Sequence, residues 1–215
     1  MKVTAVVLAA GLSCRMGENK LLLPVLGRPM LMHSISLVSQ LDVSQRILVT
    51  NPETAREIGE NAWISDDEMK CEYTRKNGNI ENEHTQNKWE IILNTEAEKG
   101  QSESVKLAVK AAKPENSLLF FMGDQPFLDR QTVENILAFN DGMHMVNPVD
   151  EQGQVASPSL IPPRFREELL ALTGDTGGRF LRQKYPQYVK TVAVSQGALL
   201  FDIDTKEAYE KIKRI

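Results

Sequence analysis

The sequence lacks the features that mark several classes of protein. Its 215 residues include only two cysteines, Cys14 and Cys71, which stand far apart and form no metal-spaced pair. A disulfide scaffold and a zinc site are therefore not expected, and this cysteine usage fits a reducing cytoplasm. No apolar run approaches the roughly 20 residues that a membrane-spanning helix needs. We therefore expect a cytoplasmic protein without a membrane partner.

Positive charge and aromatic side chains are also scarce. Lysine and arginine total 25 against 29 aspartate and glutamate, which gives a net charge of −4, and aromatic residues make up 6% of the chain. A nucleic-acid-binding domain usually has the opposite charge balance and offers side chains for stacking. We expect no nucleic-acid partner, so any polyanionic ligand must be held by a few placed cations and backbone N–H groups.

What the sequence does contain is an alternation of apolar strands and helices. Strands are expected at 3–9, 46–50, 90–93, 117–122, 143–146, 189–194 and 199–203. The run at 3–9 is apolar throughout, as in a central parallel strand covered on both faces. The alternation predicts one α/β domain over residues 1–215, with a doubly wound, mostly parallel sheet. Ligands of such sheets bind beyond the carboxyl ends of the strands.

Helix boundaries are marked by capping residues. Helices are expected at 29–40, 52–60, 102–112, 129–139, 163–172 and 178–184, and after 204–205. Asn51 and Asp129 are suited to cap the second and fourth of these, and Ser102 is a plausible cap for the third. Residues 63–88 are polar and predict no clear element beyond a turn at Asn77-Gly78.

The first motif, LAAGLSCRMGENK at residues 8–20, follows the strand at 3–9. Small residues at its start let the backbone approach a ligand closely, and exposed N–H groups in such a loop can hold phosphate oxygens. Arg15 and Lys20 could neutralise a triphosphate and its leaving pyrophosphate. The motif is neither a P-loop nor a dinucleotide fingerprint. By spacing alone, an ordinary strand–helix turn with surface cations explains it equally well.

Two further motifs place polar residues at element ends. Asp124 in MGDQP follows the strand at 117–122, where a hard oxygen ligand suits Mg²⁺, although it could simply form a turn. GQSESV at 100–105 opens a helix whose free N–H groups suit a phosphate, although it could be a plain helix start.

Two motifs near the end of the chain could complete a site. FDIDT at 201–205 places Asp202 and Asp204 on one face of a strand, though Asp204 also suits helix capping. GDTGGR at 174–179 could hold an anionic acceptor or form a glycine turn.

Taken together, these motifs resemble the MobA-like nucleotidyltransferase superfamily, and in particular its molybdenum cofactor cytidylyltransferase branch. The family signature L-A-[AG]-G-x-S-x-R-M-G-x-x-K matches residues 8–20 at every defining position, and MGDQP is the branch's typical spelling. Guanylyl-transferring relatives usually have glycine where this chain has Ala10, which favours CTP. The resemblance implies a Rossmann-like nucleotidyltransferase fold and an Mg²⁺-dependent enzyme.

The resemblance also implies a set of site residues. The nucleotide site would comprise Leu8, Ala9, Ala10, Gly11, Ser13, Arg15, Gly17, Lys20, Asn94, Ser102 and Ser104. Catalytic roles would fall to Arg15, Lys20 and Asp124. The acceptor would contact Gly174, Asp175 and Arg179. Asp124 would bind the metal together with Asp202 or Asp204, and Asp202 is the favoured partner.

The implied reaction transfers CMP from CTP to the phosphorylated pterin of the molybdenum cofactor, releasing pyrophosphate and supplying a client molybdenum enzyme. Relatives commonly have G-H-P on the acceptor side, where this chain has Val155-Ala156-Ser157-Pro158 without histidine. A sugar- or polyol-phosphate acceptor therefore stays open, as does GTP as donor. A non-catalytic factor that binds nucleotide or cofactor during enzyme maturation is the third possibility.

Overall fold

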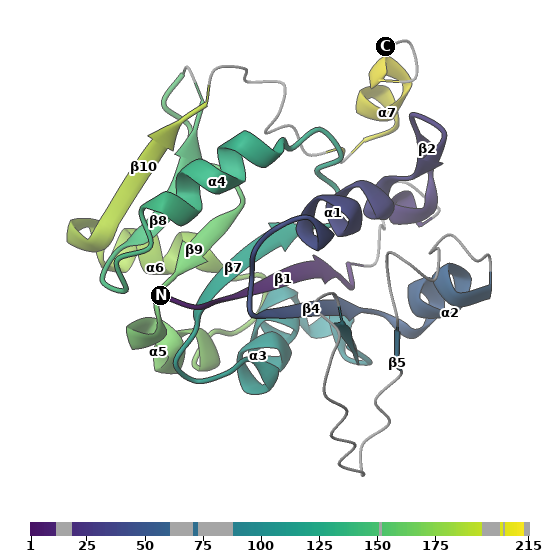
Figure 1. Cartoon of the computed structure of the whole chain (residues 1–215). Helices are drawn as coiled ribbons and strands as arrows, with labels where there is room; N and C mark the ends of the chain where they lie inside the picture. Colours follow the sequence, from purple (N-terminus) through teal and green to yellow (C-terminus); the bar gives the residue numbers. More distant parts are fainter. Residues whose placement is uncertain are drawn as a thin grey trace.

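The computed structural model describes residues 1–11, 19–60, 71–72, 88–150, 152–194, 203 and 205–212. Within these ranges the chain forms an eight-stranded sheet with the order β10-β8-β9-β7-β1-β4-β6-β5 (Figure 1). Its strands are β1 (Val3–Ala9), β4 (Gln45–Thr50), β5 (Cys71–Glu72), β6 (Trp89–Leu93), β7 (Ser117–Met122), β8 (Met145–Val149), β9 (Ser159–Ile161) and β10 (Val189–Ala193).

The helices are α1 (Met30–Ser39), α2 (Pro52–Glu60), α3 (Gln101–Ala111), α4 (Arg130–Ala138), α5 (Arg166–Leu170), α6 (Gly178–Lys184) and α7 (Lys206–Ile212). A separate small hairpin pairs β2 (Pro24–Val25) with β3 (Arg28–Pro29). No helix in the described ranges is both long and apolar enough to span a lipid bilayer.

The strand order changes direction next to β1. From β1 the chain passes to β4, then to β5 at the edge of the sheet and to β6 between β4 and β5, before it returns to β7 on the other side of β1. All neighbours in the sheet are parallel except β9, which runs antiparallel to β7 and β8. The predicted doubly wound, mostly parallel α/β sheet is therefore confirmed. The carboxyl ends of β1 and β7 flank the switch point, where such sheets bind ligands.

Helices cover the sheet on both faces, as Figure 1 shows: α1 and α4 lie on one side, and α3, α5 and α6 on the other. Alternate residues of β1 supply the two cores. Val7 packs in the cluster that includes Ile35 of α1, whereas Val6 packs in the cluster that includes Val105 of α3. Burial on both faces explains why β1 is apolar throughout.

Local capping sets the start of two helices as predicted. Asn51 Oδ1 accepts the backbone N–H of Thr54 at 2.8 Å, and Asp129 Oδ1 accepts that of Thr132 at 2.6 Å. The prediction for Ser102 is wrong. The residue before α3 is Gly100, and Ser102 lies inside the helix.

Two strand predictions differ from the structure or extend beyond the described residues, and one strand was not predicted. The strand expected at 143–146 begins at Met145 and continues to Val149. The three-residue strand β9 was not anticipated, because its run is too short to indicate a strand or its direction. Of the strand expected at 199–203, only Ile203 is described, and it is not in a strand. The turn predicted at 77–78 lies outside the described residues.

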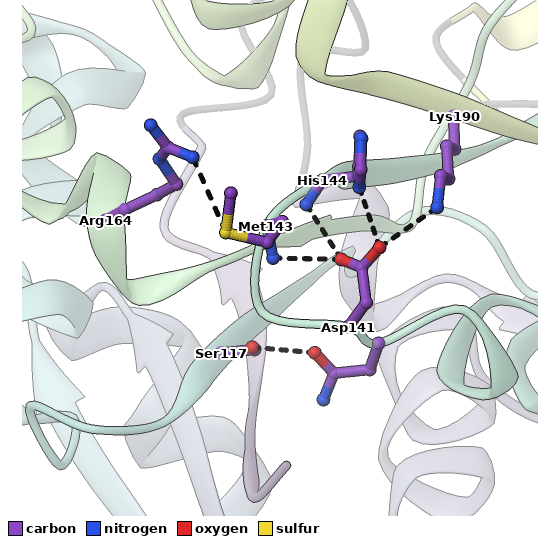
Figure 2. A network of polar contacts seen from close by, with 7 residues as sticks. Ser117, Asp141, Met143, His144, Arg164 and Lys190 are labelled. Atoms are coloured by element: carbon purple, nitrogen blue, oxygen red, sulfur yellow. Dashed lines mark hydrogen bonds and ion pairs between the residues drawn. The ribbon is translucent and has the colours of Figure 1, made fainter.

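The carboxylate of Asp141 organises the edge of the sheet where β8 and β10 begin (Figure 2). Its Oδ1 accepts the backbone N–H groups of Met143 and His144, both at 2.9 Å. Its Oδ2 meets Lys190 Nζ at 2.9 Å and His144 Nδ1 at 2.7 Å. The Met143 N–H bond, followed by Lys190, holds the pKa of Asp141 well below its usual range. Because Asp141 captures both amides, β8 starts two residues later than predicted.

Candidate active site

A glycine turn brings Asp124 beside the end of β1. β1 and β7 run parallel with Leu8 opposite Met122, and the N–H of Gly123 donates to the carbonyl of Leu8 at 3.0 Å. A Cβ on Gly123 would lie 3.1 Å from Leu31 Cδ1 and 3.3 Å from the Leu8 carbonyl oxygen. Glycine therefore allows β7 to turn closely over β1, which positions Asp124 at the switch point.

Lys20 and Asp124 form an ion pair at this point. Lys20 Nζ lies 2.6 Å from Asp124 Oδ2, although the two residues are 104 positions apart in the chain. Their side chains are only 14% and 12% exposed, so water screens the pair weakly. The second carboxylate oxygen, Asp124 Oδ1, is buried and has no hydrogen-bond partner within the part of the chain that the structure describes. That oxygen could accept a bound cation or a ligand donor.

The far end of the glycine-rich loop is held in place at Asn19, whereas Ser13, Arg15 and Gly17 lie outside the described residues. Asn19 Nδ2 donates to Thr54 Oγ1 at 2.7 Å and so ties the far end of the loop to α2. Gly11, at the near end, is exposed. The side chains of the three predicted residues before it are buried, so only their backbone could approach a nucleotide: Leu8, Ala9 and Ala10.

The segment that contains the other predicted metal ligands meets Asp124 through its backbone. The N–H of Ile203 donates to the carbonyl of Asp124 at 3.4 Å, and Ile203 is fully buried. Asp202 and Asp204 lie outside the described residues, so their roles stay predictions. In the described ranges no group of three or more potential metal-ligating side chains occurs.

The predicted residues Asn94 and Ser104 contact each other. Asn94 follows β6, and its Nδ2 donates to Ser104 Oγ at 2.9 Å in the first turns of α3. Its Oδ1 accepts the backbone N–H of Glu96 at 2.9 Å. Ser102 is fully buried, and its Oγ has no partner among the described residues. Asn94 thus anchors the start of α3 to the carboxyl end of β6, and Ser102 Oγ retains an unused hydrogen-bonding capacity.

The predicted acceptor loop docks on the start of α3. The N–H of Ser102 donates to the carbonyl of Gly174 at 3.0 Å, and that of Gln101 donates to Asp175 Oδ1 at 3.2 Å. A Cβ on Gly100 would come within 2.4 Å of the Gly174 backbone, so only glycine permits this approach. The structure therefore joins two motifs that lie about seventy residues apart. Arg179, the third predicted acceptor residue, is exposed on α6.

Two polar residues near this loop were missed in the sequence. Gln101 Nε2 lies 3.4 Å from Met122 Sδ, and its Oε1 lies 3.0 Å from the position of a Cβ on Gly177. Asn147, in the middle of β8, donates to Ser159 Oγ at 2.5 Å. The dipeptide Asn147-Pro148 was visible in the sequence, but its partner sits on β9, which was not predicted.

One known protein resembles this chain over nearly its full length, and another resembles about a third of it. Purine catabolism protein PucB of Bacillus subtilis (strain 168) is 28% identical over 219 residues, covering 97% of this chain and 95% of that protein. A Pyrococcus horikoshii protein named "Probable molybdenum cofactor guanylyltransferase" is 33% identical over 73 residues, or 32% of this chain and 38% of that protein.

Solved structures share the fold. Rv0371c of Mycobacterium tuberculosis H37Rv superposes with a TM-score of 0.78 at 23% identity, covering 100% of this chain and 99% of that one. A complex of Rv0371c with manganese gives a TM-score of 0.74 at 22% identity, covering 99% and 98%. The sequence pattern of the MobA-like NTP transferase domain matches residues 5–190. The chain therefore belongs to the MobA-like NTP transferase family and is a nucleotidyltransferase.

Proposed function

We propose that the chain transfers CMP from CTP to the molybdenum cofactor and releases pyrophosphate. The observation that carries the proposal is the buried contact of Lys20 with Asp124 at the switch point of the sheet. A cation from the glycine-rich motif and a carboxylate from MGDQP thereby meet where a triphosphate would bind. Family membership supports the reaction class, while the choice of nucleotide and acceptor rests on the motifs.

The residues present fit a divalent ion. Asp124 offers a buried carboxylate oxygen, Oδ1, without a partner among the described residues, and carboxylates are preferred ligands of Mg²⁺. Ile203 brings the DID segment to Asp124, which supports Asp202 or Asp204 as further ligands. Bound there, Mg²⁺ would neutralise charge on the phosphates that react.

The chain's own residues would position and stabilise charge. An oxygen of the acceptor phosphate forms a bond to the α-phosphorus, the bond between the α-phosphorus and its bridging oxygen breaks, and pyrophosphate takes the electron pair. The attacking phosphate is already ionised, so no strong base is needed. Lys20, with Arg15, would hold the leaving pyrophosphate, and catalysis would depend on positioning and charge.

Different segments of the chain support the proposed nucleotide and the proposed acceptor. Ala10 supports CTP, whereas the name of the Pyrococcus protein favours GTP for that relative. Asn94, Ser102 and Ser104 would contact the nucleotide, and Gly174, Asp175 and Arg179 the acceptor. A client molybdenum enzyme would receive the dinucleotide product.

The test is pyrophosphate release from MgCTP and MgGTP with three acceptors: molybdenum cofactor freed from a purified molybdenum enzyme, a sugar phosphate and a polyol phosphate. We expect turnover with MgCTP and the cofactor. Turnover only with a sugar or polyol phosphate would show that this phosphate, and not the molybdenum cofactor, is the acceptor. A preference for MgGTP would show that GTP, and not CTP, is the donor. Tight nucleotide binding without pyrophosphate release from any pair would favour the non-catalytic maturation factor.

A further inference from the structure

The backbone N–H groups in the first turn of α3 donate to acceptors within the protein. The N–H of Gln101 donates to Asp175 Oδ1 at 3.2 Å, and that of Ser102 donates to the carbonyl of Gly174 at 3.0 Å. The N–H of Glu103 donates to the carbonyl of the residue before the helix at 3.3 Å. The sequence suggested that these groups would be free to bind a phosphate. The structure corrects that expectation, because all three already have an acceptor.

Asp175 supplies the side-chain cap of α3 from a distant loop. The residue before the helix is Gly100, which has no side chain that could accept a backbone N–H. In α2 and α4 the residue at this position is the cap, through the side chains of Asn51 and Asp129. In α3 the acceptor is the Asp175 carboxylate, 74 positions along the chain from Gln101. The helix dipole also favours a carboxylate at this end.

The loop that contains Asp175 contacts α3 at two further points. A Cβ on Gly100 would lie 2.4 Å from the carbonyl carbon of Gly174, so the loop can approach only because Gly100 has no side chain. A Cβ on Gly177 would lie 3.0 Å from Gln101 Oε1, so the Gln101 side chain also rests on the loop. Gln101 Nε2 lies 3.4 Å from Sδ of Met122, the last residue of β7. The loop, the start of α3 and the strand that leads into the ion pair therefore form one continuous contact.

The cap bears on the nucleotide site because α3 carries two residues that would contact the nucleotide. Ser104 Oγ accepts Asn94 Nδ2 at 2.9 Å, which ties this residue to the end of β6. Ser102 is fully buried, and its Oγ has no partner among the described residues. The backbone N–H of Ser102 is held by the loop. Because the first turn of a helix relies on acceptors outside the helix, the position of Ser102 depends on the docked loop.

We propose that Asp175 is a positioning residue of the nucleotide site, which caps α3 from the acceptor loop and thereby fixes Ser102 for contact with the bound nucleotide. The inference rests on the proposed function for the nucleotide site, whereas the cap is a contact in the structure. The loop at 174–178 would then serve both substrate sites. A cap needs an oxygen that accepts a hydrogen bond, and asparagine serves about as well as aspartate.

The first experiment measures amide hydrogen exchange at residues 101–103 by NMR, without substrates, in the wild type, Asp175→Ala, Asp175→Asn and Glu98→Ala. Asp175 is exposed, so its variants should fold. We expect exchange about fivefold faster in Asp175→Ala, as for the typical loss of a helix cap. Asp175→Asn should exchange at close to the wild-type rate because its side-chain oxygen still accepts the N–H. Glu98→Ala, which removes an exposed carboxylate just before α3, is the matched control and should leave exchange unchanged.

Two results of this experiment would overturn the proposal. Wild-type exchange in Asp175→Ala would show that the carboxylate does not cap the helix. Exchange equally fast in Asp175→Asn and Asp175→Ala would show that the negative charge matters and that the hydrogen bond does not.

The second experiment measures the Kd of MgCTP and of MgGTP for the same four proteins by titration calorimetry, without acceptor. We expect Asp175→Ala to raise the Kd of the nucleotide that the wild type binds by about threefold. This is less than the change in exchange, because part of the population keeps the loop docked. Asp175→Asn and Glu98→Ala should bind with nearly the wild-type Kd. Faster exchange in Asp175→Ala with an unchanged Kd would refute the positioning role, because the cap would then be merely structural.

The outcome for Asp175 can be told apart from the outcome for the proposed function. If the wild type binds one of the nucleotides but releases no pyrophosphate with any acceptor, cytidylyl transfer is refuted, and the pattern across the variants alone decides the role of Asp175. If the wild type binds neither nucleotide, both are refuted.

Discussion

Substitutions of Lys20 and Asp124 should affect the free energy of unfolding and the turnover rate in different ways. At 2.6 Å and an effective dielectric constant of about 20, the attraction between Lys20 and Asp124 is roughly 6 kcal/mol, and desolvation offsets most of it. Lys20→Met keeps an apolar stem but leaves the carboxylate without its counter-charge. Breaking a buried pair in this way costs about 3–5 kcal/mol. Because both side chains retain slight exposure, we expect about 3 kcal/mol.

The double variant Lys20→Met/Asp124→Asn provides the sharper result. It removes the buried charge as well as its partner, so it should recover about 2 kcal/mol relative to Lys20→Met in urea unfolding without ligands. Turnover should behave differently. Both single variants and the double variant should lose at least about 100-fold in rate, which corresponds to about 2.7 kcal/mol of transition-state stabilisation. Stability would then return while activity does not.

A matched control uses the ion pair between Lys106 and Glu103 on α3, whose side chains are 21% and 25% exposed. Lys106→Met should cost about 0.5 kcal/mol or less and leave the rate unchanged, as expected for a helix surface pair. A near-wild-type rate for Lys20→Met would refute the role of the ammonium. Strictly additive stability losses in the double variant would refute the coupling of the two charges.

Three other substitutions test the surroundings. Gly100→Ala places a Cβ 2.4 Å from the Gly174 backbone, so it should lower unfolding free energy by about 2–3 kcal/mol and raise the acceptor KM. Asn94→Ala removes one buried and one partly buried hydrogen bond, so it should cost about 2 kcal/mol and raise the KM for MgCTP several-fold. Asp141→Asn should lower the melting temperature at pH 7 by roughly 2–4 °C, for a loss of about 1 kcal/mol from a 38% exposed carboxylate. Because the folded pKa of Asp141 is depressed, its contribution is full above about pH 4 and is lost as pH falls, so wild type and variant should converge in acid.

Each of these three substitutions has a control and an outcome that would contradict the prediction. Gly153 also has a positive φ, +78° against +105° for Gly100, but a Cβ there would meet no atom within 4 Å beyond its chain neighbours. Gly153→Ala should therefore show the backbone strain without the clash. If Gly100→Ala leaves the acceptor KM unchanged, the loop at 174–178 has no role in acceptor binding. If Asn94→Ala loses stability but keeps its KM for MgCTP, Asn94 is only a scaffold. Glu115→Gln, at an exposed site, controls for the loss of one negative charge; a pH-independent deficit in Asp141→Asn would contradict the linkage.

The sequence alone was sufficient for features whose causes are local. The apolar strand β1 and the helices capped by Asn51 and Asp129 were predicted, because burial on both faces and side-chain capping leave their mark in adjacent residues. The alternation of these elements also predicted the α/β sheet. Lys20 and Asp124 were selected as site candidates from their motifs, before any distance between them was known.

Tertiary structure decided which distant groups meet. Nothing in the neighbouring residues indicates that β9 pairs antiparallel with β7, or that Gly100 must admit the Gly174 backbone. Ser102 carried the signal of a helix cap, but docking of the acceptor loop starts α3 one residue earlier. Capping and burial act between neighbours in the chain, whereas the geometry of the site arises from packing between elements that the sheet brings together.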